Sequence, residues 1–182
     1  MGVKVITPAT QQLTVAELRL NSRADPLDTT EDPLFVRWLA RAVALAEHYT
    51  ERSIGSQTLE LALDDFPSGP IELLRGPVTS IVSIIYTNIS GVDQTLSTTL
   101  YSLDNYSQRA WALPKFGTEW PVAEGSANCV KVRYIAGDLD PAVMGALFLA
   151  VSFWYENREA SDKDVMNGGF ASLLNTVKAW RI

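Results

Sequence analysis

Few residues of this chain are of the types that perform catalysis or bind metals. The 182-residue sequence has one histidine, His48, and one cysteine, Cys129. His48 lies in the polar stretch AEHYTER, without the partners of a catalytic triad, and is interpreted as a helix-surface residue. Cys129 begins a predicted strand and is interpreted as a small buried side chain. A single cysteine and a single histidine also exclude an intrachain disulfide and the usual Cys/His zinc site.

Acidic pairs and glycines give no stronger indication of a catalytic or ligand site. Glu31-Asp32 and Asp64-Asp65 fall at a helix start and a turn, where carboxylates are common as caps. The GDLD stretch at 137–140 resembles part of a calcium loop but lacks the remaining ligands. The glycine-rich phosphate-binding motifs GxxxxGK[ST] and GxGxxG do not occur. We therefore expect no enzyme activity, no metal and no cofactor.

An aromatic loop, WALPKFGTEWP, is the one candidate for a small-ligand site. Trp111, Phe116 and Trp120 could form a platform for a sugar ring. Such a loop more often packs its aromatic side chains over a sheet, and that reading ranks first. The alternative function is therefore a cellular binding module, with carbohydrate as a possible ligand. Calorimetry with oligosaccharides, compared with a Trp111→Ala variant, would distinguish the two.

Composition limits the class of protein further. The hydrophobic fraction is 47% and the charged fraction 20%, as in ordinary globular proteins. The net charge of -6 argues against tight binding to duplex DNA. The start, MGVKVITPAT, has neither a signal-peptide pattern nor a myristoylation motif, and the apolar run at 142–155 is shorter than the roughly 20 residues of a membrane span. We expect a cytoplasmic protein without a lipid anchor.

Periodicity predicts helices at both ends of the chain and strands between them. Thr14 and Glu17 form a capping box before a short helix, and Asp32-Pro33 and Asp140-Pro141 each begin a longer one. Alternating residues predict strands near 56–63, 78–88, 100–103, 109–113 and 129–136, with one more strand before Gly76-Pro77. The expected fold class is α+β, with a helical bundle core formed by the N- and C-terminal helices and a central antiparallel β insertion. The expected single domain, 1–182, has these parts: N-terminal helices 1–55, β insertion 56–137, central helix and linker 138–167, and C-terminal helix 168–182.

The helix after Asp140 is apolar on nearly every face, so it must be buried on nearly every face. Its partner can be the core of the domain or a neighbouring subunit. It ends in SFWYENRE, where aromatic residues give way to charged ones. The candidate subunit-interface residues there are Phe153, Trp154, Tyr155 and Arg158. Gly168-Gly169, in the polar stretch after this helix, is predicted to be a hinge.

Taken in order, several stretches resemble the head-to-tail connector (adaptor, or head-completion) family of tailed phages. They are VITPATQQLTVAELRLNSR, ALAEHYTERSIGSQTLELALDDFP, IELLRGPVTSIVSIIYTNISG, YSLDN, the WP at 120–121, VKVRYIAG, AVMGALFLAVSFWYENRE and SLLNTVKAWRI. The resemblance covers most of the chain. Its specificity comes from the order of many moderate matches and not from one motif.

The resemblance implies a non-enzymatic virion protein, assembled in the host cytoplasm and located in the particle neck. It would form a ring, commonly of twelve copies, between the portal and the stopper or tail at the DNA-exit vertex. Packaged DNA would pass through it without sequence-specific binding. The family's C-terminal segment commonly docks on the portal, which here implies Phe170, Leu173, Leu174, Val177, Trp180 and Arg181. Gly168-Gly169 stands where the family usually has a proline.

Overall fold

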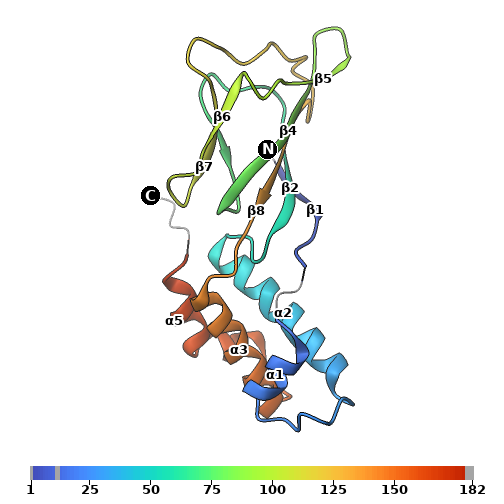
Figure 1. Ribbon diagram of the computed structural model, residues 1–182, viewed down its shortest axis with the longest axis vertical. Helices are drawn as coiled ribbons and strands as arrows, with labels where there is room; N and C mark the ends of the chain where they lie inside the picture. The colour runs from blue at the N-terminus through green and yellow to red at the C-terminus, as the bar shows by residue number, and fades with distance from the viewer. Residues whose placement is uncertain (1, 11–12, 179–182) are drawn as a thin grey trace. The chain divides into compact units, whose positions relative to one another are not determined.

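The computed structural model describes residues 2–10 and 13–178 (Figure 1). These residues divide into two compact units, a β unit of residues 2–10 and 55–138 and a helical unit of residues 13–54 and 139–178. The helices are α1 (Val15–Asn21), α2 (Asp32–Thr50), α3 (Pro141–Glu156), α4 (Asp162–Met166) and α5 (Gly169–Asn175). The strands are β1 (Gly2–Thr7), β2 (Gln57–Leu63), β3 (Ile71–Leu73), β4 (Val78–Thr87), β5 (Asp93–Thr95), β6 (Tyr101–Asp104), β7 (Ala110–Pro114) and β8 (Val130–Ala136).

The β unit consists of two antiparallel sheets. One has five strands in the order β1-β2-β8-β4-β5, and the other has three in the order β3-β7-β6. The period-2 pattern of β2 decides its orientation, because Leu59 and Leu61 are fully buried while the intervening Glu60 stays partly exposed. Glu60 lies opposite Arg133 of β8 and pairs with it at 2.6 Å.

Side chains from both sheets form one hydrophobic core in the β unit. Leu59, Leu61, Val132 and Tyr134 come from the larger sheet, and Ile71, Leu73, Tyr101, Ala110 and Ala112 from the smaller one. Tyr134 is buried and donates its hydroxyl to the carbonyl of Leu74 at 2.8 Å. Burial raises the pKa of this phenol, since the charged form would lose its hydration.

The predicted α+β class is confirmed in part. Helices and antiparallel strands are both present, and the strands of the middle region lie close to their predicted positions. The predicted antiparallel β insertion consists of two sheets and has a core of its own. Residues 2–7, placed in the N-terminal helical part by the sequence, form β1 against β2. β1 is an edge strand in which only Val3 is partly buried, so it has no buried face of the kind that half-buried strands show.

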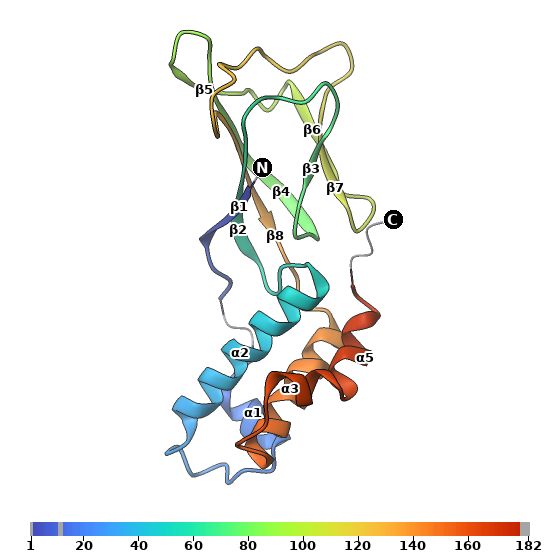
Figure 2. The ribbon, with the colours of Figure 1, turned by 180° about the vertical axis from the view of Figure 1, so that it is seen from behind.

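The helical unit has its own apolar core, to which α1, α2, α3, α4 and α5 all contribute. Figure 2 shows α1, α2, α3 and α5 of this unit from behind. The predicted capping box of α1 is confirmed: Thr14 accepts from the Glu17 backbone N–H, and the Glu17 carboxylate accepts from the Thr14 N–H at 2.7 Å. Asp140 likewise caps α3, accepting from the N–H of Ala142 at 2.8 Å, with Pro141 at the first helical position. None of the described helices combines the length and apolar character needed to cross a membrane.

Helix ends differ most from the predictions. α2 ends at Thr50, before the predicted boundary of the N-terminal helical part at residue 55, because Glu51 adopts a left-handed conformation with φ of 56°. α3 ends at Glu156, and the predicted linker after it contains α4, which is fixed by a Ser161/Asp164 capping box. The final helix, predicted to reach the C-terminus, ends at Asn175.

Candidate functional site

The surface of α3 is the centre of the candidate assembly site. Its fully buried residues form the core side of the helix: Val143, Ala146, Leu147, Ala150, Val151 and Trp154. The opposite side is only partly covered, and Leu149 there is 37% exposed. A helix that is apolar all round therefore leaves part of its apolar surface open in the single chain.

This open side is the floor of a shallow groove, which we call the α3 groove. It is lined by Asn21, Arg23, Gly145, Phe148, Leu149, Ser152, Phe153 and Glu156. The end of α1 forms one wall, since the Asn21 side-chain amide donates to the Ser152 hydroxyl at 2.8 Å. The adjacent Ser22 hydroxyl lies 3.0 Å from the same Ser152 oxygen. These contacts fix the wall against the floor.

Helix α5 lies close to the floor of the α3 groove. A Cβ atom at Gly145 would lie 3.8 Å from Leu173 Cδ1, and one at Gly169 would lie 3.1 Å from Leu149 Cδ1. Gly169 therefore permits a close approach between α5 and α3. The predicted hinge role of Gly168 and Gly169 stays a prediction; in the structure Gly168 is the N-cap of α5 and has an extended backbone.

The four residues predicted as a subunit interface do not share one environment. Trp154 is buried in the helical core, with the Arg41 guanidinium 4.3 Å from its ring centroid. Tyr155 stacks on Phe35 with a centroid distance of 5.4 Å. Only Phe153 and Arg158 line open surface, in a second depression with Asn157, Glu159, Ala160 and Asp164. The structure thus gives Trp154 a core position, and Phe153 joins the two depressions.

The predicted portal-docking residues also differ in burial. Phe170, Leu174 and Val177 are buried in the core of the helical unit, whereas Leu173 is half-buried beside Gly145. Trp180 and Arg181 lie outside the described residues. A docking role for this segment remains a prediction, and in the single chain its apolar side chains stabilise the helical unit.

Contacts from α2 and the following turn hold the end of α5. Arg52 donates to the carbonyl of Val177 at 2.9 Å, and the Tyr49 hydroxyl donates to Asn175 Oδ1 at 2.7 Å. The Thr176 hydroxyl donates to the Leu173 carbonyl at 2.7 Å. Arg52 and Thr176 thus satisfy backbone carbonyls at the point where α5 stops short of its apolar pattern, and Tyr49 holds the Asn175 side chain there.

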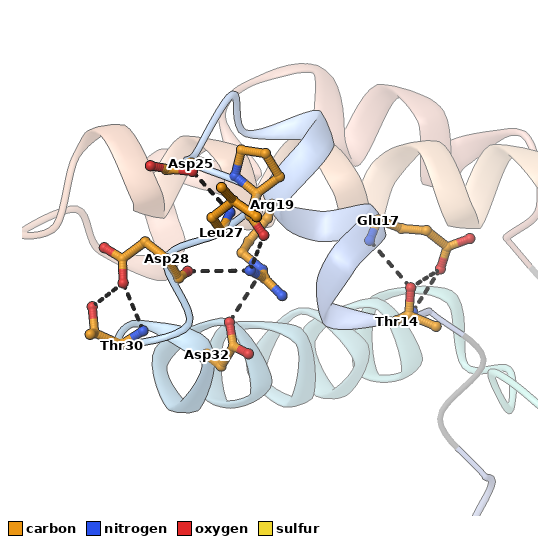
Figure 3. Close-up of polar contacts among 9 residues, drawn as sticks. Thr14, Glu17, Arg19, Asp25, Leu27, Asp28, Thr30 and Asp32 are labelled. Carbon is orange, nitrogen blue, oxygen red and sulfur yellow. Dashed lines mark hydrogen bonds and ion pairs between the residues drawn. The ribbon is translucent and has the colours of Figure 1, made fainter.

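A second exposed feature of the helical unit is the loop between α1 and α2 (Figure 3). Arg19 Nη1 donates to the carbonyls of Pro26, at 2.8 Å, and Asp28, at 3.3 Å. Its Nε lies 3.3 Å from Asp32 Oδ1, an ion pair without the alignment of a hydrogen bond. Between the two held carbonyls, Leu27 is 89% exposed. The polar stretch SRADPLDTTED indicates a turn here, but no local pattern links Arg19 to carbonyls several residues away, so its contacts could not be predicted.

Residues considered for catalysis occupy structural positions. His48 is exposed on α2. Cys129 is buried with its Sγ 3.1 Å from the Asp64 carbonyl, and the Asp64 carboxylate accepts from the Asn128 N–H. Within residues 2–10 and 13–178, no group of three or more His, Cys, Asp or Glu side chains could hold a metal ion.

The three aromatic residues of the alternative sugar site have different surroundings. Trp120 stacks on Phe66 at 5.2 Å and donates its Nε1–H to the Gly69 carbonyl at 2.9 Å. Trp111 lies on β7 with the Arg109 guanidinium 5.5 Å from its ring, and Phe116 is fully exposed. Trp120 therefore packs over the β core, as expected if the aromatic loop covers a sheet.

Comparison with known proteins shows a likeness of fold. No family model and no curated protein sequence matches the chain. A chain in the virion of the native gene transfer agent (GTA) particle aligns with a TM-score of 0.80 and 22% identity, over 100% of this chain and 97% of that one. A chain in the neck of the empty GTA particle, computed with C6 symmetry, aligns with the same values.

The chain shares its fold with a GTA neck component. A chain in the neck of the native particle, computed with C12 symmetry, aligns with a TM-score of 0.68 at the same identity and coverage. The alignments include both units of the chain, because they cover its whole length. The resemblance to head-to-tail connectors predicted from the sequence is thereby confirmed as a likeness of fold.

Proposed function

We propose that the chain is a structural, non-enzymatic protein of the neck of a phage-like particle. It forms a ring between the portal and the stopper or tail at the DNA-exit vertex, and so completes the head. The observation that carries the proposal is the full-length likeness, at a TM-score of 0.80, to a chain in the GTA neck. The C12 symmetry used for one of these necks supports a ring of twelve copies.

The partners follow from this position. They are further copies of the chain, the portal protein and a stopper or tail-completion protein, within a neck assembled in the host cytoplasm. The C-terminal segment, with Leu173 at its accessible edge, is the part proposed to contact the portal. Packaged DNA passes through the ring without sequence-specific binding, in keeping with the net charge of -6, which repels phosphate groups.

Mass determination by light scattering tests the proposal directly. The purified chain is measured across a range of concentration, alone and mixed with the portal protein encoded near it. A ring, or a monomer that becomes part of a larger complex only with the portal, is the expected result. A chain that remains monomeric and does not co-elute with the portal would contradict the proposal, and an unrelated acidic protein of similar mass controls for nonspecific association.

A further inference from the structure

The outward side of α2 carries a continuous exposed stripe. Its exposed residues recur every three or four positions and so lie along one face of the helix. They are Pro33, Val36, Arg37, Ala40, Ala44 and His48. The stripe has low relief because its middle consists of alanines, and Val36 beside them is 43% exposed. It carries a cation, Arg37, and no carboxylate at an exposed position.

The α2 stripe and the α3 groove lie on opposite sides of the helical unit. α2 and α3 pack through their buried faces, where Phe35, Leu39 and Ala42 of α2 join the same core as Leu147 and Ala150 of α3. At about 100° per residue, Gly145 on the groove floor is half a turn away from the buried Trp154. In both ribbon views, α2 forms one side of this unit and α3 with α5 the other (Figures 1 and 2).

Two different surfaces on opposite sides are what a closed ring requires. A ring is built from head-to-tail contacts, in which one patch of each subunit meets a different patch of the next. The α3 groove is apolar along Phe148, Leu149 and Phe153, so a flat helix face of small side chains can approach it closely. Helix axes pack about 8–10 Å apart, and small side chains favour the shorter distance.

Charge supports the same pairing. Glu156 lies at the end of the groove and is exposed. Arg37 on the stripe is also exposed, and its Nε donates to the Pro33 carbonyl of its own helix. The groove carries one cation as well, Arg23, on the wall formed by the end of α1. A register that brings Arg37 to Glu156 places the neutral alanine segment along the apolar floor.

We propose that the α2 stripe of one copy packs lengthwise into the α3 groove of the next copy, and that this contact closes the ring. The inference rests on the proposed ring function and identifies the surfaces that the ring uses. The occupant of the groove is a second copy of this chain, because the same unit carries both complementary surfaces. The exposed apolar area that the sequence assigned to core or subunit contact thus becomes buried on assembly.

Disulfide trapping tests the pairing in the full chain. In a Cys129→Ser background, Ala44→Cys and Leu149→Cys are made separately and together. With Arg37 beside Glu156 and the two helices antiparallel, the exposed Ala44 faces Leu149, because each lies seven positions from the charged residue of its own helix. We expect mild oxidation to link the double variant into a ladder of oligomers and a mixture of the two single variants into a heterodimer. Each single variant alone should remain unlinked. Ala127→Cys paired with Leu149→Cys is the matched control, since Ala127 is exposed in the β unit, and this pair should give no ladder.

Substitution of a stripe residue by a bulky charged residue tests the pairing independently. Ala40→Arg should keep the helical circular dichroism of the parent, because position 40 is exposed and arginine is a good helix former. It should raise the concentration needed for assembly, or for capture by the portal, by at least tenfold. Ala127→Arg introduces the same residue at an exposed site outside the pairing and should have little effect.

The outcomes separate this inference from the proposed function. If the parent chain assembles or is captured by the portal, but the Ala44/Leu149 pair does not crosslink in that assembly, the interface is wrong and the neck function stands. Crosslinking of either single variant with itself indicates a two-fold contact and also overturns the pairing. If the parent chain neither assembles nor binds the portal protein, both proposals fail together.

Discussion

The guanidinium of Arg19 reaches across the α1–α2 loop to Asp32, with 3.3 Å between Nε and Oδ1. The same side chain donates to the carbonyls of Pro26 and Asp28, and only 11% of it is exposed. One side chain from α1 therefore sets the path of the loop and the start of α2. This arrangement presents Leu27 to solvent on a fixed backbone.

Removal of the Arg19 guanidinium should destabilise the helical unit. Arg19→Met leaves two loop carbonyls and a partly buried carboxylate without their partner, a loss of about 1–3 kcal/mol in the free energy of unfolding. Urea titration followed by circular dichroism measures this loss. Arg37→Met is the matched control, since Arg37 is exposed and the same substitution there should change stability by less than about 0.5 kcal/mol. Equal effects at both positions would show that the loop contacts do not contribute.

The helical unit should lose stability in acid as its capping carboxylates become protonated. The Thr14 backbone N–H and hydroxyl lower the pKa of Glu17, and the Ser161 hydroxyl and N–H lower that of Asp164. A carboxylate with a lowered pKa in the folded state stabilises the fold above its unfolded pKa. This contribution is lost as the pH falls through the folded pKa.

Stability should therefore decline as the pH falls below about 4.3 for Glu17 and about 3.9 for Asp164, their ordinary values. Urea midpoints measured between pH 6 and pH 3 test this. Glu17→Gln should reduce the slope of stability against pH, while Glu159→Gln, at an exposed position without a capping contact among the described residues, should leave the slope unchanged. A Glu17→Gln variant with the parent slope would count against the capping explanation.

Gly145→Ala should stabilise the single chain. Glycine inside a helix is less favourable than alanine by about 0.5–1 kcal/mol, and the added Cβ would lie 3.8 Å from Leu173 Cδ1, an ordinary contact distance. We expect a rise of about that size in the free energy of unfolding, measured by urea titration. Gly169→Ala is the informative comparison, because its Cβ would lie only 3.1 Å from Leu149 Cδ1 and should cancel part of the gain.

Local rules account for the parts of the fold that the sequence predicted. The Thr14/Glu17 capping box, the Asp140-Pro141 helix start and the alternation around Leu59 and Leu61 each involve residues close together in the chain. These features depend on backbone hydrogen bonding and on the spacing of apolar side chains, and nearby residues determine both. The order of these elements was also enough for the resemblance that the fold comparison supports.

Features decided by distant partners could not be predicted in the same way. Because α3 is apolar on every side, its sequence did not reveal that Trp154 faces the core while Phe153 faces the groove. The end of α5 depends on Arg52, which lies 125 positions before Val177 in the chain. The close approach of α5 to α3 at Gly169 and Leu149 is likewise not visible in the sequence.

The burial of α5 changes how portal docking should be tested. Truncation after Gly169, the cut that a docking tail suggests, would remove Phe170 and Leu174 from the helical core. Loss of portal capture would then report unfolding. Truncation after Lys178 removes Trp180 and Arg181 and keeps every described core residue. We expect this shorter chain to retain the thermal midpoint of the parent and to lose at least tenfold in portal affinity.

Leu173→Asp extends the test to the described part of the segment. Leu173 is half-buried at the edge of α5, so the substitution should weaken portal capture with a smaller loss of stability than Leu174→Asp, which places a carboxylate in the core. Affinity and thermal midpoint are measured on the same samples. A truncated chain that is folded and still binds the portal with parental affinity would place the docking surface elsewhere, and the exposed Leu27 loop would then be the first surface to mutate.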